Sequence, residues 1–204
     1  MGYCLVAYSI VWLAGFGGFY DAGYIAQYRD SNGFTGWNDA AVMAWFVLST
    51  AIFGMAGSLS SALGEEIGWR GFLVPELAKS MSFTKLALIT GVIWACWHLP
   101  VILLGNYHNN GPGALPLYGQ LVMFFICVIS AAIPMAYLRL KSGSLWTGAL
   151  FHASHNLAIQ AIFNPLTIQH ADSAKYIDEL GLVLPLTMVP VAGYFLWKGR
   201  REFG

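Results

Sequence analysis

Charge is what this sequence has least of. Only 10% of its 204 residues are charged, whereas soluble domains carry roughly 25%. The ten basic and ten acidic residues cancel, so no basic patch indicates a nucleic-acid partner. Cysteine is also scarce. Cys4, Cys96 and Cys127 lie in apolar stretches without a Cys-x-x-Cys pair, which excludes that redox or metal motif and predicts free thiols in the core.

Long apolar runs dominate instead, because 57% of the residues are hydrophobic. A helix that crosses a bilayer needs about 20 mostly apolar residues. Six stretches come close to that length: 3–20, 41–63, 84–104, 117–138, 145–164 and 180–197. We therefore predict an all-α, polytopic transmembrane helical bundle with about six spans and a polar intramembrane cavity, forming a single domain over residues 1–204.

The basic residues predict the orientation. They gather in three places, which the positive-inside rule puts on the cytoplasmic side: Lys79 with Lys85, Arg139 with Lys141, and Lys198 with Arg200 and Arg201. Counting spans from there puts both termini in the cytoplasm. The connections 21–39, 105–116 and 165–179 then lie outside, and we expect His108 and His170 to be solvated loop residues.

Ionisable groups are costly in hydrocarbon, so those next to apolar segments mark a candidate site. Glu66 and Arg70 are four residues apart and can pair on one helix face, which predicts a structural ion pair. Glu65 points about 100° away and needs another partner. His152 and Asn156 are likewise four apart and can face one cavity.

Two further histidines lie in apolar stretches. His98 comes from a different helix, and Pro100 lacks a backbone donor and so loosens that helix end. His155 shares a helix with His152, and we interpret it as a hydrogen-bonded histidine of the bundle. A carboxylate can deprotonate a water, a histidine can orient it, and a histidine with an asparagine can donate to an oxyanion. Such a set would hydrolyse an amide.

Three motifs in this order resemble one family. They are Glu-Glu-x-x-x-Arg at Glu65 to Arg70, aromatic-x-x-x-His from Trp94 to His98, and His-x-x-x-Asn from His152 to Asn156. The chain is similar to the CAAX protease and bacteriocin-processing (CPBP or Abi) family, which includes the Ras-converting CAAX endoproteases. The resemblance covers roughly residues 60–160.

The resemblance implies an intramembrane glutamate-type endopeptidase. Glu65 would be the general base, His98 would help hold the water, and His152 with Asn156 would form the oxyanion site. Glu66 and Arg70 would support the site. We expect an integral protein of a bacterial plasma membrane, with membrane lipids and a peptide or membrane-tethered, CAAX-like substrate as partners.

The chain departs from the family pattern in two ways. Trp94 stands where the second motif usually has Phe, which keeps an aromatic ring, and we assign Trp94 only to packing and interface anchoring. Relatives often carry about eight spans and we count six here, so we expect an amino-terminal pair to be missing, which would affect substrate access or regulation more than the chemistry.

Other proteolytic mechanisms lack their signatures. The sequence contains no His-Glu-x-x-His, Gly-x-Gly-Asp or Gly-x-Ser-Gly, and Cys96 lies on nearly the opposite helix side from His98. Glu65, His98 and His152 are a possible zinc set. Asn156 suits an oxyanion donor better than a zinc ligand, so we predict no cofactor, with a zinc-dependent protease as the alternative.

A non-catalytic role is the other alternative. An immunity or binding protein of the membrane could retain the same residues as a polar core. One geometric conflict also arises from the predicted spans. If the second span ends near residue 63, Glu65 lies at the cytoplasmic rim, about 20 Å from the level of His98. Either the stretch 64–80 bends back into the bundle or the predicted boundaries are shifted.

Overall fold

The architecture was obtained as a computed structural model, which describes residues 2–105, 107 and 111–204. His108, predicted to be a solvated loop residue, lies outside the described residues. His170 is described and is exposed in its loop, as predicted.

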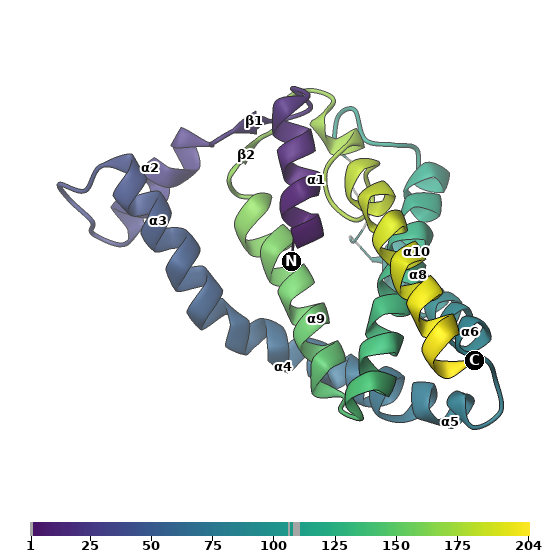
Figure 1. Ribbon diagram of the computed structural model, residues 1–204. Helices are drawn as coiled ribbons and strands as arrows, with labels where there is room; N and C mark the ends of the chain where they lie inside the picture. The colour runs from purple at the N-terminus through teal and green to yellow at the C-terminus, as the bar shows by residue number, and fades with distance from the viewer. Residues whose placement is uncertain (1, 106, 108–110) are drawn as a thin grey trace.

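Helices make up most of the described chain (Figure 1), and strands make up very little of it, which confirms the all-α prediction. Four helical segments deviate from α geometry: the π-helical η1 (Thr50–Gly54), η2 (Ile67–Leu73) and η3 (Leu157–Phe163), and the 3₁₀ turn η4 (Ser173–Lys175). The α-helices are α1 (Gly2–Leu13), α2 (Ala22–Ser31), α3 (Asp39–Ser49), α4 (Met55–Glu66), α5 (Val74–Ala78), α6 (Phe83–Trp97), α7 (Leu99–Leu104), α8 (Leu117–Ser142), α9 (Trp146–Asn156) and α10 (Val183–Phe203). Strands β1 (Gly18–Phe19) and β2 (Thr167–Ile168) form one short antiparallel pair.

Three helices in the described residues are long and apolar enough to cross a membrane: Asp39–Ala78, Phe83–Leu104 and Leu117–Ser142. The prediction of six spans is therefore not confirmed. The first stretch was predicted to run over 3–20, but α1 ends at Leu13, because Gly15 adopts a left-handed backbone with φ of 74°. Its 12 residues are too few to cross a bilayer. The predicted stretch 145–164 folds as α9 with η3, and the stretch 180–197 folds as α10. Neither is among the helices that are long and apolar enough to cross a membrane.

The second predicted span has the largest boundary error. It was expected to end near residue 63, but the helix continues through α4, η2 and α5 to Ala78. Between residue 63 and Ala78 the only proline is Pro75, which lies in α5 just after η2 and does not end the helix. Glu65 therefore lies within a continuous helix, and the conflict over its depth came from the misplaced boundary.

Helix α8 lies at the centre of the packed part of the molecule. It packs against α6 on one side, α10 on another, and α9, while α1 covers α10 (Figure 1). Cys4 and Cys127 are buried in this core as predicted, but Cys96 is exposed on the outer face of α6, so the expectation of three core thiols is wrong for Cys96.

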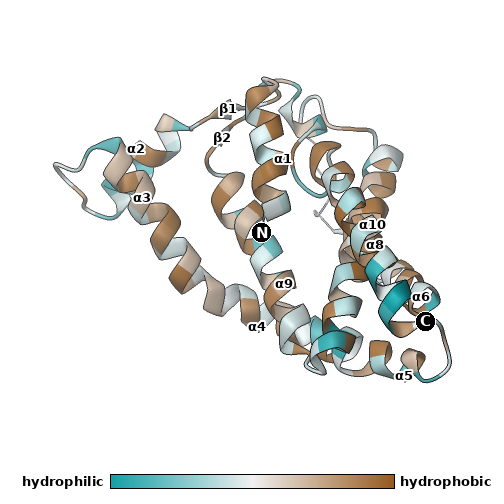
Figure 2. Ribbon diagram, in the orientation of Figure 1, coloured by the Kyte–Doolittle hydropathy of each residue, from teal (hydrophilic) through white to brown (hydrophobic). Residues whose placement is uncertain are grey.

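The long helix α3–α5 leaves much of its apolar surface uncovered. Leu48, Ile52 and Phe53 are 55%, 58% and 72% exposed, and Figure 2 shows brown, hydrophobic colour along α3 and α4. An apolar surface of this extent fits contact with lipid chains better than contact with water.

The predicted cytoplasmic groups meet at one end of the bundle. Lys141 Nζ at the end of α8 donates to Glu202 Oε2 of α10 at 2.7 Å, and α5 lies at the same end (Figure 1). The β1–β2 pair lies at the opposite end. Helix α8 ends at Ser142 and is capped by Gly143, whose φ of 70° suits glycine.

The α6–α8 contact depends on Gly91. A Cβ at this position would lie 3.0 Å from Ile129 Cα and 3.1 Å from Ala132 Cβ. We predict that Gly91→Val separates the two helices and lowers the free energy of unfolding by about 1–3 kcal/mol. The measurement is the thermal unfolding midpoint in detergent. Gly57→Val is the control, because nothing lies within 4 Å of a Cβ there. An equal change in both variants would contradict the packing role of Gly91.

Candidate active site

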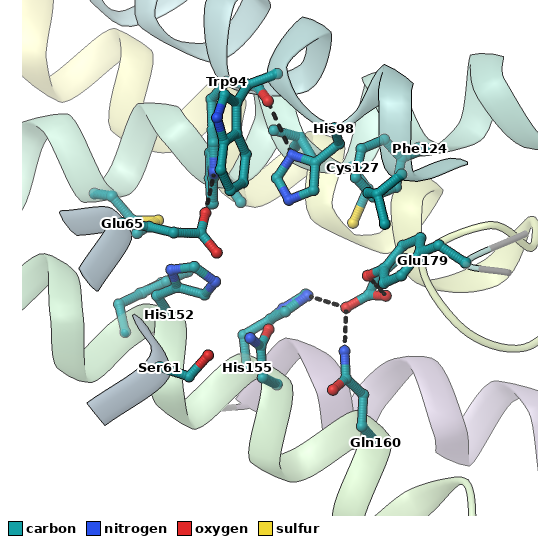
Figure 3. A pocket seen from close by; sticks show the side chains of 18 residues that line it. Ser61, Glu65, Trp94, His98, Phe124, Cys127, His152, His155, Gln160 and Glu179 are labelled. Carbon is teal, nitrogen blue, oxygen red and sulfur yellow. Dashed lines mark hydrogen bonds and ion pairs between the residues drawn. The ribbon is translucent and has the colours of Figure 1, made fainter. Parts of the chain in front are cut away.

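One cavity of about 330 Å³ brings together the residues singled out in the sequence. Glu65, His98, His152 and Asn156 all line it, and they come from α4, the α6–α7 junction and α9. Figure 3 shows Glu65 and His152 on one side of this space and His98 facing them. The predicted common cavity is present. Glu66 and Arg70 lie behind it, in the protein interior.

Glu66 and Arg70 form the buried ion pair that their spacing predicts. Arg70 Nη1 lies 2.8 Å from Glu66 Oε1, and the side chains are 1% and 0% exposed. Glu66 Oε1 also faces His152 Nδ1 at 3.1 Å. The Arg70 guanidinium lies 4.4 Å from the centre of the Trp94 ring, which adds a cation–π contact. The pair thus connects α4 and η2 to α6 and α9.

Glu65 has the separate partner that its position on the helix requires. Trp94 Nε1 donates to Glu65 Oε2 at 2.8 Å. A Phe at this position could not donate this hydrogen bond, so Trp94 does more than pack, and its assignment to packing and anchoring alone is wrong. The donor holds one carboxylate oxygen and leaves Oε1 facing the cavity (Figure 3).

The two site histidines are each held through Nδ1. His98 Nδ1 lies 2.9 Å from the Trp94 carbonyl oxygen, which can only accept, so Nδ1 carries the proton and Nε2 of the neutral ring is an acceptor. His152 Nδ1 in turn donates to Glu66. Pro100 explains the place of His98: it cannot donate to the preceding turn, and α6 ends at Trp97.

Asn156 is the last residue of α9, directly before η3. It lines the cavity, and within the described part of the chain its side chain makes no hydrogen bond. Its amide is therefore free to donate to a ligand. A π-helical segment also begins directly after Glu66. Such segments widen the helix and are frequent at functional sites.

Sequence reasoning missed a second polar group on the same cavity. Glu179, in the connection before α10, accepts from Tyr107 OH at 3.1 Å and from Gln160 Nε2 at 3.4 Å. His155 Nε2 lies 3.3 Å from Glu179 Oε1, and His155 Nδ1 is hydrogen-bonded to Tyr3 OH, as predicted for a hydrogen-bonded histidine of the bundle. Burial raises the pKa of Glu179, but the hydrogen bond and charge of His155 outweigh it and lower the pKa below its ordinary value. The only signal in the sequence was that Glu179, one of few acidic residues, directly precedes the apolar stretch 180–197.

The lining of the cavity includes side chains of the kinds that can bind metals. Among the residues that the structure describes, no three His, Cys, Asp or Glu side chains are grouped so that they could hold a metal ion. Glu65, His98 and His152 line the cavity without forming such a cluster.

Comparison with known proteins gives two matches. The family model "Type II CAAX prenyl endopeptidase Rce1-like" matches residues 43–158, which include Glu65, His98, His152 and Asn156. The "CAAX prenyl protease 2" of Methanococcus maripaludis is 26% identical over 140 residues, which are 66% of this chain and 46% of the relative. The chain thus spans about half the length of that relative. No solved structure matches this chain.

The family model covers more than half of the chain, including every motif from which the resemblance was inferred. Three helices in the described part of the chain are long and apolar enough for an integral membrane protein. The chain therefore belongs to the Rce1-like family of type II CAAX prenyl endopeptidases.

Proposed function

We propose that the protein is an intramembrane endopeptidase that hydrolyses a peptide bond in this cavity. The observation that carries the proposal is the convergence of Glu65, His98, His152 and Asn156 on one cavity from three separate helical segments. A polar residue that occurred by chance on each helix would have no reason to face the others.

The first step needs an ordered water. Glu65 Oε1 faces the cavity, and His98 Nε2 is an acceptor because its Nδ1 is bound to a carbonyl oxygen. A water between them donates one hydrogen to each, which turns an oxygen lone pair toward the substrate carbonyl carbon. Glu65 then accepts the proton as that oxygen attacks.

The second step develops negative charge on the carbonyl oxygen. The Asn156 amide has no other partner among the described residues, and His152 is held at Nδ1 by Glu66. With Nδ1 donating to Glu66, His152 in its imidazolium form donates to the oxyanion from Nε2. The two donors stabilise the oxyanion. Collapse of the intermediate breaks the C–N bond, and Glu65 gives its proton to the leaving amine.

The substrate proposed is a membrane-associated, CAAX-like peptide or protein. The relative named as a CAAX prenyl protease supports this class. The cavity also has an apolar wall, which includes Phe124, Val128 and Phe151 and suits aliphatic side chains. The proposed setting is a bacterial plasma membrane, with both termini in the cytoplasm and lipids around the long helix. The proposed chemistry uses no metal, and the zinc-dependent alternative is tested below.

The proposal predicts complete dependence on the Glu65 carboxylate. Glu65→Gln keeps the shape and an acceptor for Trp94 but cannot take the proton, so hydrolysis should fall by about 100-fold or more. The measurement is cleavage of a quenched-fluorescent peptide library by detergent-purified protein, with and without a zinc chelator.

Activity that survives the chelator and is lost in Glu65→Gln supports the proposed mechanism. Activity lost to the chelator and restored by zinc would instead assign Glu65, His98 and His152 to a metal. If the variant were as active as the wild type, the proposed role of Glu65 would be wrong. A wild type that cleaves no library peptide would favour the immunity or binding role.

The structure also predicts that Arg70 mainly supports folding, whereas His98 and His152 mainly support activity. Arg70→Ala leaves Glu66 buried without its partner, which costs about 3–5 kcal/mol and should lower the folded yield. His98→Ala and His152→Ala should leave folded but inactive protein. Folded yield is measured by size-exclusion chromatography in detergent, and activity by peptide cleavage. Equal loss of folding in all three variants would contradict this division.

A further inference from the structure

The polar group around Glu179 has no part in the proposed hydrolysis. The Glu179 side chain is 9% exposed, and three other side chains converge on it: His155, Gln160 and Tyr107. His155 and Gln160 both reach the same oxygen, Oε1, and Tyr107 reaches Oε2. Figure 3 shows His155 and Gln160 pointing away from Glu65 toward this carboxylate.

The two residues that reach Oε1 flank Asn156 in the sequence. His155 is its neighbour at the end of α9, and Gln160 lies one turn later in η3. The helix changes from α to π geometry between them. Because the Asn156 side chain makes no hydrogen bond within the described residues, its direction depends on the backbone at this junction.

The backbone that carries Glu179 is held by its neighbour Asp178. The Glu179 backbone N–H donates to Asp178 Oδ1 at 2.8 Å, and Asp178 Oδ2 accepts at 3.2 Å from Nδ2 of Asn164, directly after η3. Tyr3 OH forms a hydrogen bond with His155 Nδ1 from the other side. Both nitrogens of His155 are therefore occupied, so this ring has no free atom for a substrate and can only hold its neighbours.

We infer that Glu179 is a positioning residue, which clamps the α9–η3 junction through His155 and Gln160 and so aims the Asn156 amide at the oxyanion. This inference rests on the proposed function of Asn156. The inference assigns a role to Glu179, which lies outside residues 43–158, the part of the chain that the family model matches.

The test is a double-mutant cycle between Glu179→Gln and Asn156→Ala. Glu179→Gln keeps the side-chain volume but removes the charge and one of the two acceptor oxygens. We expect kcat to fall about 10-fold with KM unchanged, because a small misplacement of a donor costs transition-state binding. In the Asn156→Ala background the same change should cost nothing further, because there is no amide left to aim.

Glu202→Gln is the matched control. Glu202 also accepts from a tyrosine and a cation, Tyr137 OH at 3.0 Å and Lys141 Nζ at 2.7 Å, but it lies at the far end of α10, away from the cavity. It should leave kcat unchanged. Gln160→Leu removes one arm of the clamp and should lower kcat by a smaller factor, which keeps the inference testable if Glu179→Gln folds poorly.

Hydrogen exchange provides a readout that does not depend on activity. Amides of 152–163 should exchange faster in Glu179→Gln than in the wild type or Glu202→Gln. Unchanged exchange there, or equal losses of kcat in the wild-type and Asn156→Ala backgrounds, would overturn the clamp. If the wild type hydrolyses no peptide, the proposed function fails, and the exchange data alone then support or overturn the clamp.

Discussion

The buried ion pair between Glu66 and Arg70 is the interaction on which the site depends. Both side chains are almost fully excluded from solvent, and a charge left alone at such a position is strongly destabilising. His152 joins the pair through Glu66, and Trp94 stacks on the guanidinium. Arg139 of α8 donates from Nε to the Arg70 carbonyl oxygen at 2.6 Å. The pair therefore fixes α4, α6, α8 and α9 relative to one another.

This arrangement places the polar side chains around the cavity in two layers. The inner layer carries the paired charges and never meets the substrate in the proposed mechanism. The outer layer, with Glu65, His98 and Asn156, keeps free atoms toward the cavity. Gly148 shows how closely the layers fit: a Cβ there would lie 3.1 Å from both Glu66 Oε2 and Arg70 Cγ. A larger residue at this position would press on the ion pair.

The sequence predicts contacts within one helix better than contacts between helices. The Glu66–Arg70 pair and the common face of His152 and Asn156 follow from spacing alone. The end of α1 and the extension of the second span to Ala78 do not, because glycine backbone geometry and π-helical segments decide them. Apolar length alone indicated about six spans, whereas three helices of the described residues are long and apolar enough to cross a membrane.

Partners from distant parts of the chain could not be predicted in the same way. Trp94 donates to Glu65 across two helices, and Glu179 reaches His155 from a loop that was predicted to be external. Neither contact has a periodic signal, because tertiary packing alone brings these side chains together. The departure of Trp94 from the usual Phe was visible, but its hydrogen bond was not.

The most direct test of the central claim is a single turnover of peptide in ¹⁸O-labelled water, followed by mass spectrometry of the products and of the protein. If Glu65 activates water for direct attack, the new carboxyl terminus carries one ¹⁸O atom and Glu65 carries none. Label in the Glu65 carboxylate would show that it attacks the substrate itself, and would contradict the account.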